Sequence, residues 1–132
     1  MPSLELGIRD RWASDTQLPT LLPASRLFTG AAVDNPPRPY AVLKRTGTTA
    51  LTRTSARTAV DRARVELHVW SEDLALGMSI ASRFAERFDQ SSFDLTDGRV
   101  LDMRLADFHH ERVGSELWQL TLRYDCTLAS TI

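Results

Sequence analysis

Hydrophobic and polar residues alternate along three stretches in the second half of the chain, at residues 63–69, 101–106 and 118–128. Successive side chains of a strand point to opposite faces of a sheet, so each stretch predicts a strand with one buried and one solvated face. The last stretch is the longest and the most regular. Residues 40–46 and, more briefly, 26–29 add two further strands to the prediction.

Two other stretches repeat their hydrophobic residues with the spacing of an α-helix. Over about 71–88, leucine, methionine, alanine and phenylalanine side chains fall on one face, and the serine that begins the stretch is a good N-cap. Near the N-terminus, Leu4, Ile8 and Trp12 form a stripe at intervals of four residues. We therefore predict one main helix that packs on the sheet and one short N-terminal helix.

All six prolines lie within the first 39 residues. Proline fixes φ and removes a backbone donor, so regular strand pairing should be scarce there and common from Tyr40 onward. We expect a single domain over residues 1–132, with a proline-containing region at 1–39 and an α+β core at 40–132. The predicted fold is α+β, an antiparallel sheet of four to five strands with the main helix on one face.

The connection at residues 46–58 holds six threonines, two arginines and one glycine. Threonine favours extended backbone, and compact domains seldom keep structureless loops longer than about 12 residues. We therefore predict that a β-ribbon, over about 44–64, protrudes from the sheet. A lone ribbon is only marginally stable in water and should dock on something. A mobile polar loop is the alternative interpretation.

Charge is unevenly distributed, although the formal net charge is only −1. Residues 35–60 carry five basic side chains and no acid, whereas residues 72–132 carry 11 of the 17 acids. We therefore expect a basic end and an acidic end. Hydrophobic residues make up 42% of the chain, which excludes a disordered chain, and no apolar run approaches the roughly 18 residues of a transmembrane helix. We expect a soluble protein made inside the cell.

Candidate catalytic chemistry is sparse. Asp107, His109, His110 and Glu111 could supply a general base or metal ligands, but neighbouring histidines point to different sides of an extended chain, which favours a solvated hairpin turn. The sequence has no phosphate-binding glycine loop, dinucleotide-binding motif or nucleophile elbow. Cys126 alternates with core residues, which favours buried packing over a reactive thiol. We expect no catalytic activity, no metal site and no cofactor.

Several segments follow one another in a recognisable order. A proline-rich loop leads to PYAVLKR, and RARVELHVWSED runs directly into the main helix. This order resembles the small tail-completion or tail-terminator proteins of long-tailed phages and prophages, in which a "pyvvy" strand precedes a "v-v-v-w" strand and a helix. The resemblance covers roughly residues 18–128. The matching residues are Pro39, Tyr40, Val42, Val65, Leu67, Val69 and Trp70, with the helix from Ser71.

The resemblance implies a structural protein of the virion. Such proteins form a ring, commonly of six subunits, at the head-proximal end of the tail tube, where the ring stops tube growth, joins the neck and lets DNA pass. The implied partners are further copies of the chain, the tail tube protein, a neck or head-completion protein and, non-specifically, DNA in the lumen. The implied place is the virion, after assembly in the host bacterial cytoplasm. No membrane is involved.

A ring of this kind needs two different surfaces on each subunit, and the ribbon and the opposed charges could supply them. The residues that we select for contacts of the ribbon with a partner or the lumen are Arg45, Thr49, Leu51, Arg53 and Arg57. Two other classes of function remain open. One is a nucleic-acid-binding module that uses the basic 38–64 region, with steeply salt-dependent binding. The other is a small α+β enzyme that uses Asp107, His109 and Glu111.

Overall fold

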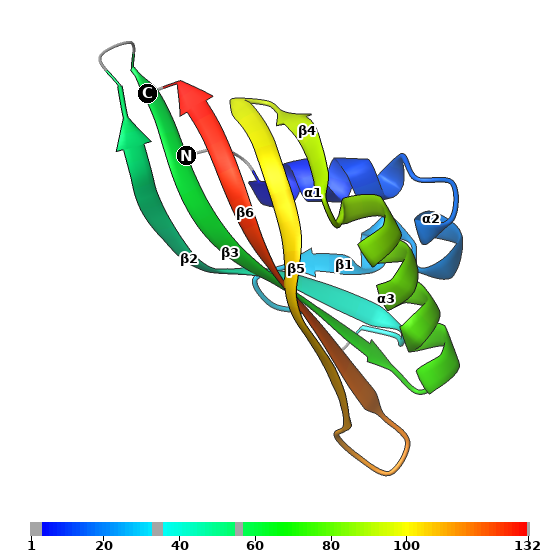
Figure 1. Cartoon of the computed structure of the whole chain (residues 1–132). Helices are drawn as coiled ribbons and strands as arrows, with labels where there is room; N and C mark the ends of the chain where they lie inside the picture. Colours follow the sequence, from blue (N-terminus) through cyan, green and yellow to red (C-terminus); the bar gives the residue numbers. More distant parts are fainter. Residues whose placement is uncertain (1–3, 33–35, 55–56, 132) are drawn as a thin grey trace.

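The computed structural model describes residues 4–32, 36–54 and 57–131. Six strands form one curled sheet in the order β1-β2-β3-β6-β5-β4, and the helices pack on one of its faces (Figure 1). We call this face the inner face and the opposite one the outer face. The elements in chain order are α1 (Leu4–Ala13), α2 (Leu18–Leu21), the 3-10 turn η1 (Ala24–Arg26), β1 (Leu27–Thr29), β2 (Tyr40–Arg53), β3 (Thr58–Ser71), α3 (Leu74–Phe88), β4 (Ser91–Leu95), β5 (Gly98–Arg112) and β6 (Trp118–Thr131).

The N-terminal helix contributes its predicted stripe to the core. Leu4, Ile8 and Trp12 are all fully buried. The indole ring of Trp12 lies 5.7 Å from the ring of Phe84 on α3, and its Nε1–H donates to the carbonyl of Leu22 at 2.9 Å. The indole therefore joins α1 to α3 through packing and to the α2 segment through a hydrogen bond.

The main helix covers the inner face of β3 and β6, as its apolar face predicts. Its buried side chains include Ile80, Phe84 and Phe88. The N-cap is Asp73, whose carboxylate accepts from the N–H of Ala75 at 3.0 Å, and not the expected Ser71. Ser71 is the last residue of β3, and its hydroxyl accepts from the N–H of Asp73. A second capping residue two positions further along the chain therefore shifts the start of the helix to Leu74.

The sheet has more strands than the expected four to five, and it is mixed. β1 pairs with β2 in parallel, whereas all other neighbours are antiparallel. β4 is the strand that the hydrophobic pattern does not predict. Phe93 is its one buried side chain, so the segment shows no alternation. Pairing with β5 defines it as a strand, and Thr96 and Asp97 connect the two strands.

Two strands extend further than their hydrophobic residues indicate. β2 continues past Thr46 to Arg53, paired with β3, so a ribbon and not a loop occupies the described part of 46–58. β5 continues to Arg112, so the residues 109–112 lie in a strand and not in a turn. Side chains in both extensions are largely exposed, which removes the alternation that marks a strand in sequence. Backbone pairing with the neighbouring strand sets their conformation instead.

Candidate assembly surface

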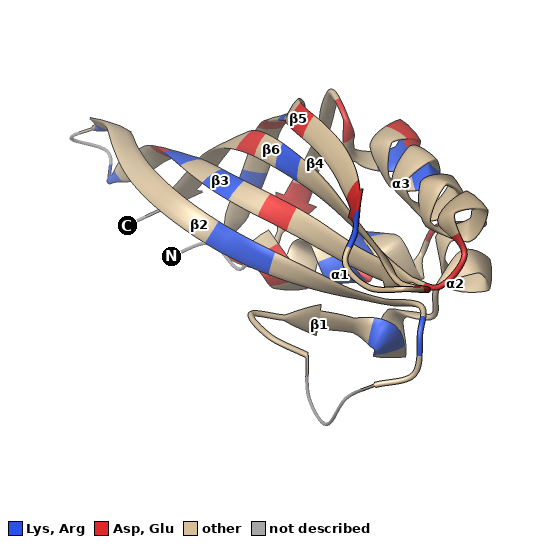
Figure 2. Ribbon diagram, turned by 90° about the horizontal axis from the view of Figure 1, so that it is seen from below, with Lys and Arg blue, Asp and Glu red and all other residues tan. Residues whose placement is uncertain are grey.

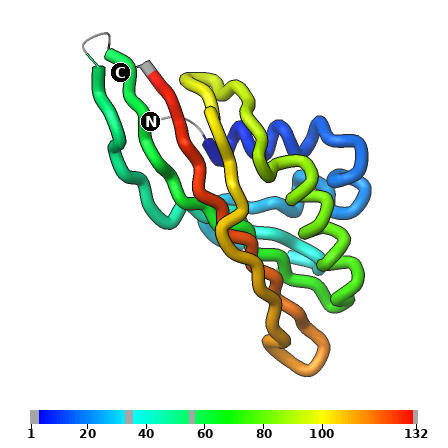
Figure 3. Tube along the Cα trace, viewed as in Figure 1, coloured from blue at the N-terminus to red at the C-terminus, as the bar shows by residue number. Residues whose placement is uncertain are grey.

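Two hairpins project from opposite ends of the sheet (Figures 1 and 3). Arg45 of β2 and Leu105 of β5 lie at the same level, joined across the sheet by Val65 and Tyr124. We call the hairpin residues 46–64 the β2–β3 arm and the residues 106–123 the β5–β6 arm. The two arms extend in opposite directions from this row of paired residues, so each copy has two different protruding hairpins.

The β2–β3 arm has a free strand edge. β1 pairs with residues 41–43 of β2, and Gly30 donates to the carbonyl of Leu43; from Lys44 onward, β3 is the one strand beside β2 in the described part of the chain. Residues 46–53 are all exposed. An exposed edge with unpaired backbone groups is a template for another strand. The arm is therefore suited to pairing with another polypeptide.

Four of the five selected contact residues lie on this arm. Thr49 and Leu51 are exposed, Leu51 to 46%. Arg53 places its Nη1 2.8 Å from the carboxylate of Asp61 on the adjacent strand. Arg57 stands in the turn with a φ of 62° and donates its N–H to the carbonyl of Thr54 at 3.1 Å. The four residues therefore share the arm but not one face of it: Thr49 lies opposite the exposed Arg62, and Arg53 opposite the buried Ala59.

Arg45 lies at the base of the arm and contacts the body of the molecule. Its Nε and Nη2 donate to the two carboxylate oxygens of Glu5 on α1, at 2.8 and 3.1 Å. The side chain of Arg45 is only 15% exposed. A bidentate pair of this kind fixes both side chains. In this structure Arg45 therefore joins α1 to the sheet, while the other four residues extend away from it.

The β2–β3 arm is basic. It carries four arginines and one acid, Asp61. The Asp61 side chain is 7% exposed and pairs with Arg53, so the remaining arginines dominate the surface of the arm. This part of the molecule gives the expected basic region a definite place.

The expected separation into a basic and an acidic end is not found on the rest of the sheet. Basic and acidic side chains interleave along the strands (Figure 2). Arg64 pairs with Asp125 at 3.3 Å, and Arg123 lies 3.6 Å from Asp107. Acids that cluster late in the sequence meet arginines across neighbouring strands, so charges that are separated in sequence are mixed in space.

The residues of the enzyme alternative lie on the exposed outer face of the β5–β6 arm. His109 is 3.8 Å from the carboxylate of Asp107, and both side chains are about half exposed. His110 points to the inner face, near the rings of Phe108 and Trp118. Within the described residues, no group of three or more His, Cys, Asp or Glu side chains could hold a metal ion. The histidines diverge, as their spacing in a strand predicts.

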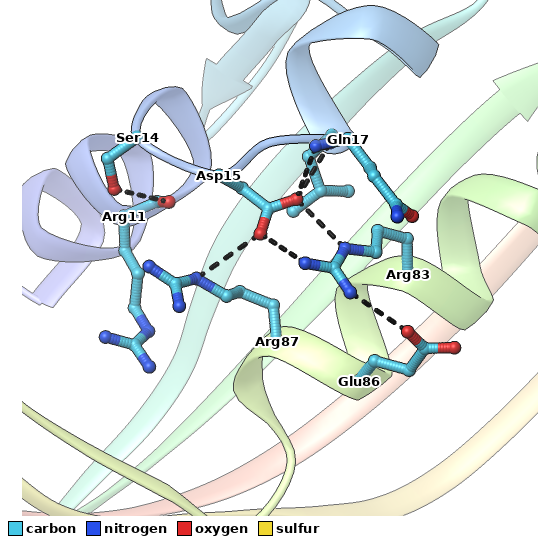
Figure 4. Close-up of polar contacts among 8 residues, drawn as sticks. Arg11, Ser14, Asp15, Gln17, Arg83, Glu86 and Arg87 are labelled. Carbon is cyan, nitrogen blue, oxygen red and sulfur yellow. Dashed lines mark hydrogen bonds and ion pairs between the residues drawn. The ribbon is translucent and has the colours of Figure 1, made fainter.

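A buried ion cluster joins α1, α2 and α3 (Figure 4). Asp15 accepts from the Nε and Nη2 of Arg83 at 3.0 and 2.7 Å and from the backbone N–H groups of Gln17 and Leu18. Arg87 lies 3.5 Å from the same carboxylate. The hydrogen bonds from Arg83 and the backbone hold the pKa of Asp15 well below its ordinary value. The cluster therefore joins α3 to the segment between α1 and α2.

No local sequence pattern reveals this cluster, because Arg83 stands 68 residues after Asp15. A local signal exists: the carboxylate of Asp15 accepts from backbone N–H groups at the start of α2, as a capping residue does. That signal identifies a helix start but not an ion pair with a distant helix.

Cys126 is fully buried, as expected from its place in the alternating pattern. Burial raises the pKa of its thiol to about 12. The thiolate is the reactive form of cysteine, so this side chain is unreactive at neutral pH. In the described residues, no helix has the length and hydrophobicity needed to cross a membrane.

Comparison with known proteins identifies a shared fold and a protein family. Among solved structures, a chain described as "Virion of native gene transfer agent (GTA) particle" superposes with a TM-score of 0.71 at 12% sequence identity. The match covers 93% of this chain and 92% of that chain, so the two share a fold over nearly their whole lengths. No curated protein matches the sequence. A family model described as "Tail completion protein gp17" matches residues 7–129. The chain therefore belongs to the tail completion protein gp17 family.

Proposed function

We propose that the chain is a structural component of a phage-like virion. Six copies of it form a ring at the end of the tail tube. The ring ends the tube, joins it to a neck or head-completion protein and lets DNA pass. Family membership and the fold shared with a gene transfer agent chain support a virion role. Assembly would take place in the host bacterial cytoplasm. No catalytic step is part of this proposal.

The β2–β3 arm is the observation that carries the ring. Its eight residues 46–53 are exposed, its outer strand has a free edge, and Leu51 adds an exposed apolar side chain. Exposed edges of this kind are normally covered or blunted in proteins that work alone. The arm therefore favours contact with a neighbouring subunit or with the last ring of the tail tube, through Thr49, Leu51, Arg53 and Arg57.

On the outer face of the sheet, the mixed charge pattern favours a protein partner over a DNA duplex. A surface that binds DNA as its main function concentrates unpaired cations. Here Arg64 and Arg123 each lie close to an acid on a neighbouring strand. DNA contact in the lumen would then be transient and non-specific, in keeping with passage through a ring.

The experiment is to shorten the arm. Thr48 lies opposite Ala63, so residues 49–62 can be replaced by Asn-Gly, a pair that suits a two-residue hairpin turn. We expect the shortened chain to fold, by circular dichroism and thermal melting, and to sediment as a monomer where the unaltered chain sediments as a closed oligomer. Electron microscopy of tail tubes mixed with each chain should show a ring at one tube end for the unaltered chain only.

The nucleic-acid alternative has its own outcome in the same experiment. An unaltered monomer that binds generic duplex with a steep salt dependence, and forms no ring, would favour the alternative and reject the proposal. Rings that persist after the arm is shortened would show that another surface mediates assembly.

A further inference from the structure

The second half of β5 is a free edge at the other end of the sheet. β4 pairs with β5 as far as Met103, opposite Ser91. Among the described residues, β6 is then the one strand beside residues 104–112. Each copy thus carries two free strand edges, one on β2 and one on β5. They extend in opposite directions from the row of paired residues that joins Arg45 to Leu105.

An apolar groove lies on the inner face beside the β5 edge. α3 packs mainly over β3 and β6, so part of β5 beyond Met103 is left uncovered. Leu105 is 37% exposed there, and Phe108 is half-buried. The groove has a volume of about 350 Å³, open solvent included. The residues that line it are Met78, Ala81, Ser82, Ala85, Leu105, Phe108 and Leu122.

We propose that this edge and groove receive the β2–β3 arm of a second copy of the chain. Residues 46–53 of the arm add a strand beside residues 104–112 of β5, and Leu51 enters the groove between α3 and β5. The proposal rests on ring formation, as proposed above, and names the acceptor surface. It makes each contact head-to-tail, because the donor and acceptor surfaces are different parts of the chain.

Backbone and side-chain chemistry match between the two surfaces. Along both edges the described residues present backbone N–H and C=O groups that no further strand pairs, which an added strand would satisfy. Two groups are already engaged: the N–H of Leu105 donates to the carboxylate of Asp89 at 2.8 Å, and the carbonyl of Thr52 accepts from Arg53 at 2.9 Å. Leu51 is 46% exposed on the arm, and the groove is lined almost entirely by apolar side chains. Removing both from water together is favourable.

Charge also favours this pairing over contact between two copies of the same arm. The β2–β3 arm carries four arginines and one acid, whereas the β5–β6 arm carries three acids and two arginines. The residues 104–112 that would receive the arm carry two acids and two arginines. Two β2–β3 arms side by side would therefore repel each other, and an arm beside this neutral stretch of β5 would not.

The levels of the two edges set the geometry of the assembly. The free part of β2 begins where Arg45 is level with Leu105 and runs away from the free part of β5. Neighbouring copies must therefore be displaced along the strands before the edges meet. In a closed ring of strands such a stagger is accommodated by tilting the strands relative to the axis. Three antiparallel pairings separate β2 from β5 within one sheet, so copies with the same orientation place the added strand antiparallel to β5.

Disulfide trapping in the full chain tests the contact. Leu51 and Leu105 are replaced by cysteine together, and both positions are exposed. Within one copy β3 and β6 separate the two positions, so a disulfide between them must join two copies. The native Cys126 is buried and does not compete. After mild oxidation of the assembled protein, we expect a ladder of covalent oligomers, reversed by reductant, on a denaturing gel.

A matched control uses Leu51→Cys with Leu6→Cys, since Leu6 on α1 is as exposed as Leu51. This pair should give no ladder. A mixture of the two single variants Leu51→Cys and Leu105→Cys should give dimers that contain one of each.

The outcomes separate this inference from the proposed function. A ladder from Leu51→Cys with Leu105→Cys, and none from the control pair, supports the docking. Rings without a ladder, or an equal ladder with the control pair, overturn the docking while the ring remains. An unaltered chain that stays monomeric overturns the ring and the docking with it.

Discussion

The two halves of β2 differ although they form one continuous strand. Residues 41–43 are buried, with β1 on one side and β3 on the other, whereas residues 46–53 are exposed and have β3 alone beside them in the described structure. The first half supplies apolar side chains to the core, and the second supplies mainly threonine with one exposed leucine. The first half is thus buried within a single copy, while the second half leaves one strand edge open in the described structure.

The two halves of β5 repeat this difference at the other end of the sheet. Val100 and Met103 are buried beside β4, whereas residues 109–112 are exposed on the β5–β6 arm. The same separation appears twice, so substitutions should sort into two groups. Those in the body should lower stability, and those in the arms should lower assembly.

The largest effect on stability is expected in the body, from Trp12→Ala. The side chain is fully buried, packs on Phe84 and donates a hydrogen bond to Leu22. Truncation of a buried aromatic side chain to alanine costs about 3–5 kcal/mol of unfolding free energy. Denaturant titration measures the loss. A loss below about 1 kcal/mol would show that the core does not depend on this contact.

A smaller loss is expected from Asp15→Asn, which removes the charge from the ion cluster. The remaining arginines would be partly buried without their carboxylate, at a cost of about 2–4 kcal/mol. Asp10→Asn, at an exposed position on α1, is the matched control and should change stability by less than about 0.5 kcal/mol.

The stability of Asp15→Asn should also depend on pH differently from that of the unaltered protein. The pKa of Asp15 is lowered in the folded protein from 3.8, the value of an unperturbed aspartate. Its contribution to stability is therefore complete above that value and is lost as pH falls through the folded-state pKa. Between neutral pH and pH about 3, unaltered protein should lose more unfolding free energy than Asp15→Asn. Equal losses would contradict the ion pair.

The smallest effect on stability is expected in the arm, from Leu51→Asp. The side chain is already 46% exposed, so the unfolding free energy of the monomer should change by less than about 0.5 kcal/mol. Assembly, followed by sedimentation velocity, should be lost. Leu6→Asp introduces the same charge at a similarly exposed site on α1 and should leave assembly intact. Loss of assembly in both variants would mean that added charge, and not the arm, is responsible.

The helices and the central strands could be predicted from the sequence because each has one buried and one exposed face, which gives a periodic pattern of hydrophobic residues. The stripe of Leu4, Ile8 and Trp12, and the alternation along β3 and β6, are set by one buried and one exposed face. β4 has no such pattern, since Phe93 alone is buried, and neither do the exposed parts of β2 and β5. In those segments backbone pairing with a distant strand determines the structure.

The candidate site was predictable in part. The length and threonine content of 46–58 led to the ribbon, which the structure confirms. Two contacts, Arg45 with Glu5 and Asp15 with Arg83, could not be predicted from the sequence, because each joins residues that are 40 or more positions apart. The groove beside β5 also required the structure, since its lining comes from α3, β5 and β6 together.

Amide hydrogen exchange of the full chain, compared between dilute monomer and assembled protein, tests the central claim most directly. The claim is that the body is complete alone and the arms are completed by assembly. We predict that assembly slows exchange in residues 46–53 and 104–112 and leaves α1, α3 and the middle of β3 unchanged. Slowed exchange confined to the helices, with both strand edges unchanged, would contradict the account.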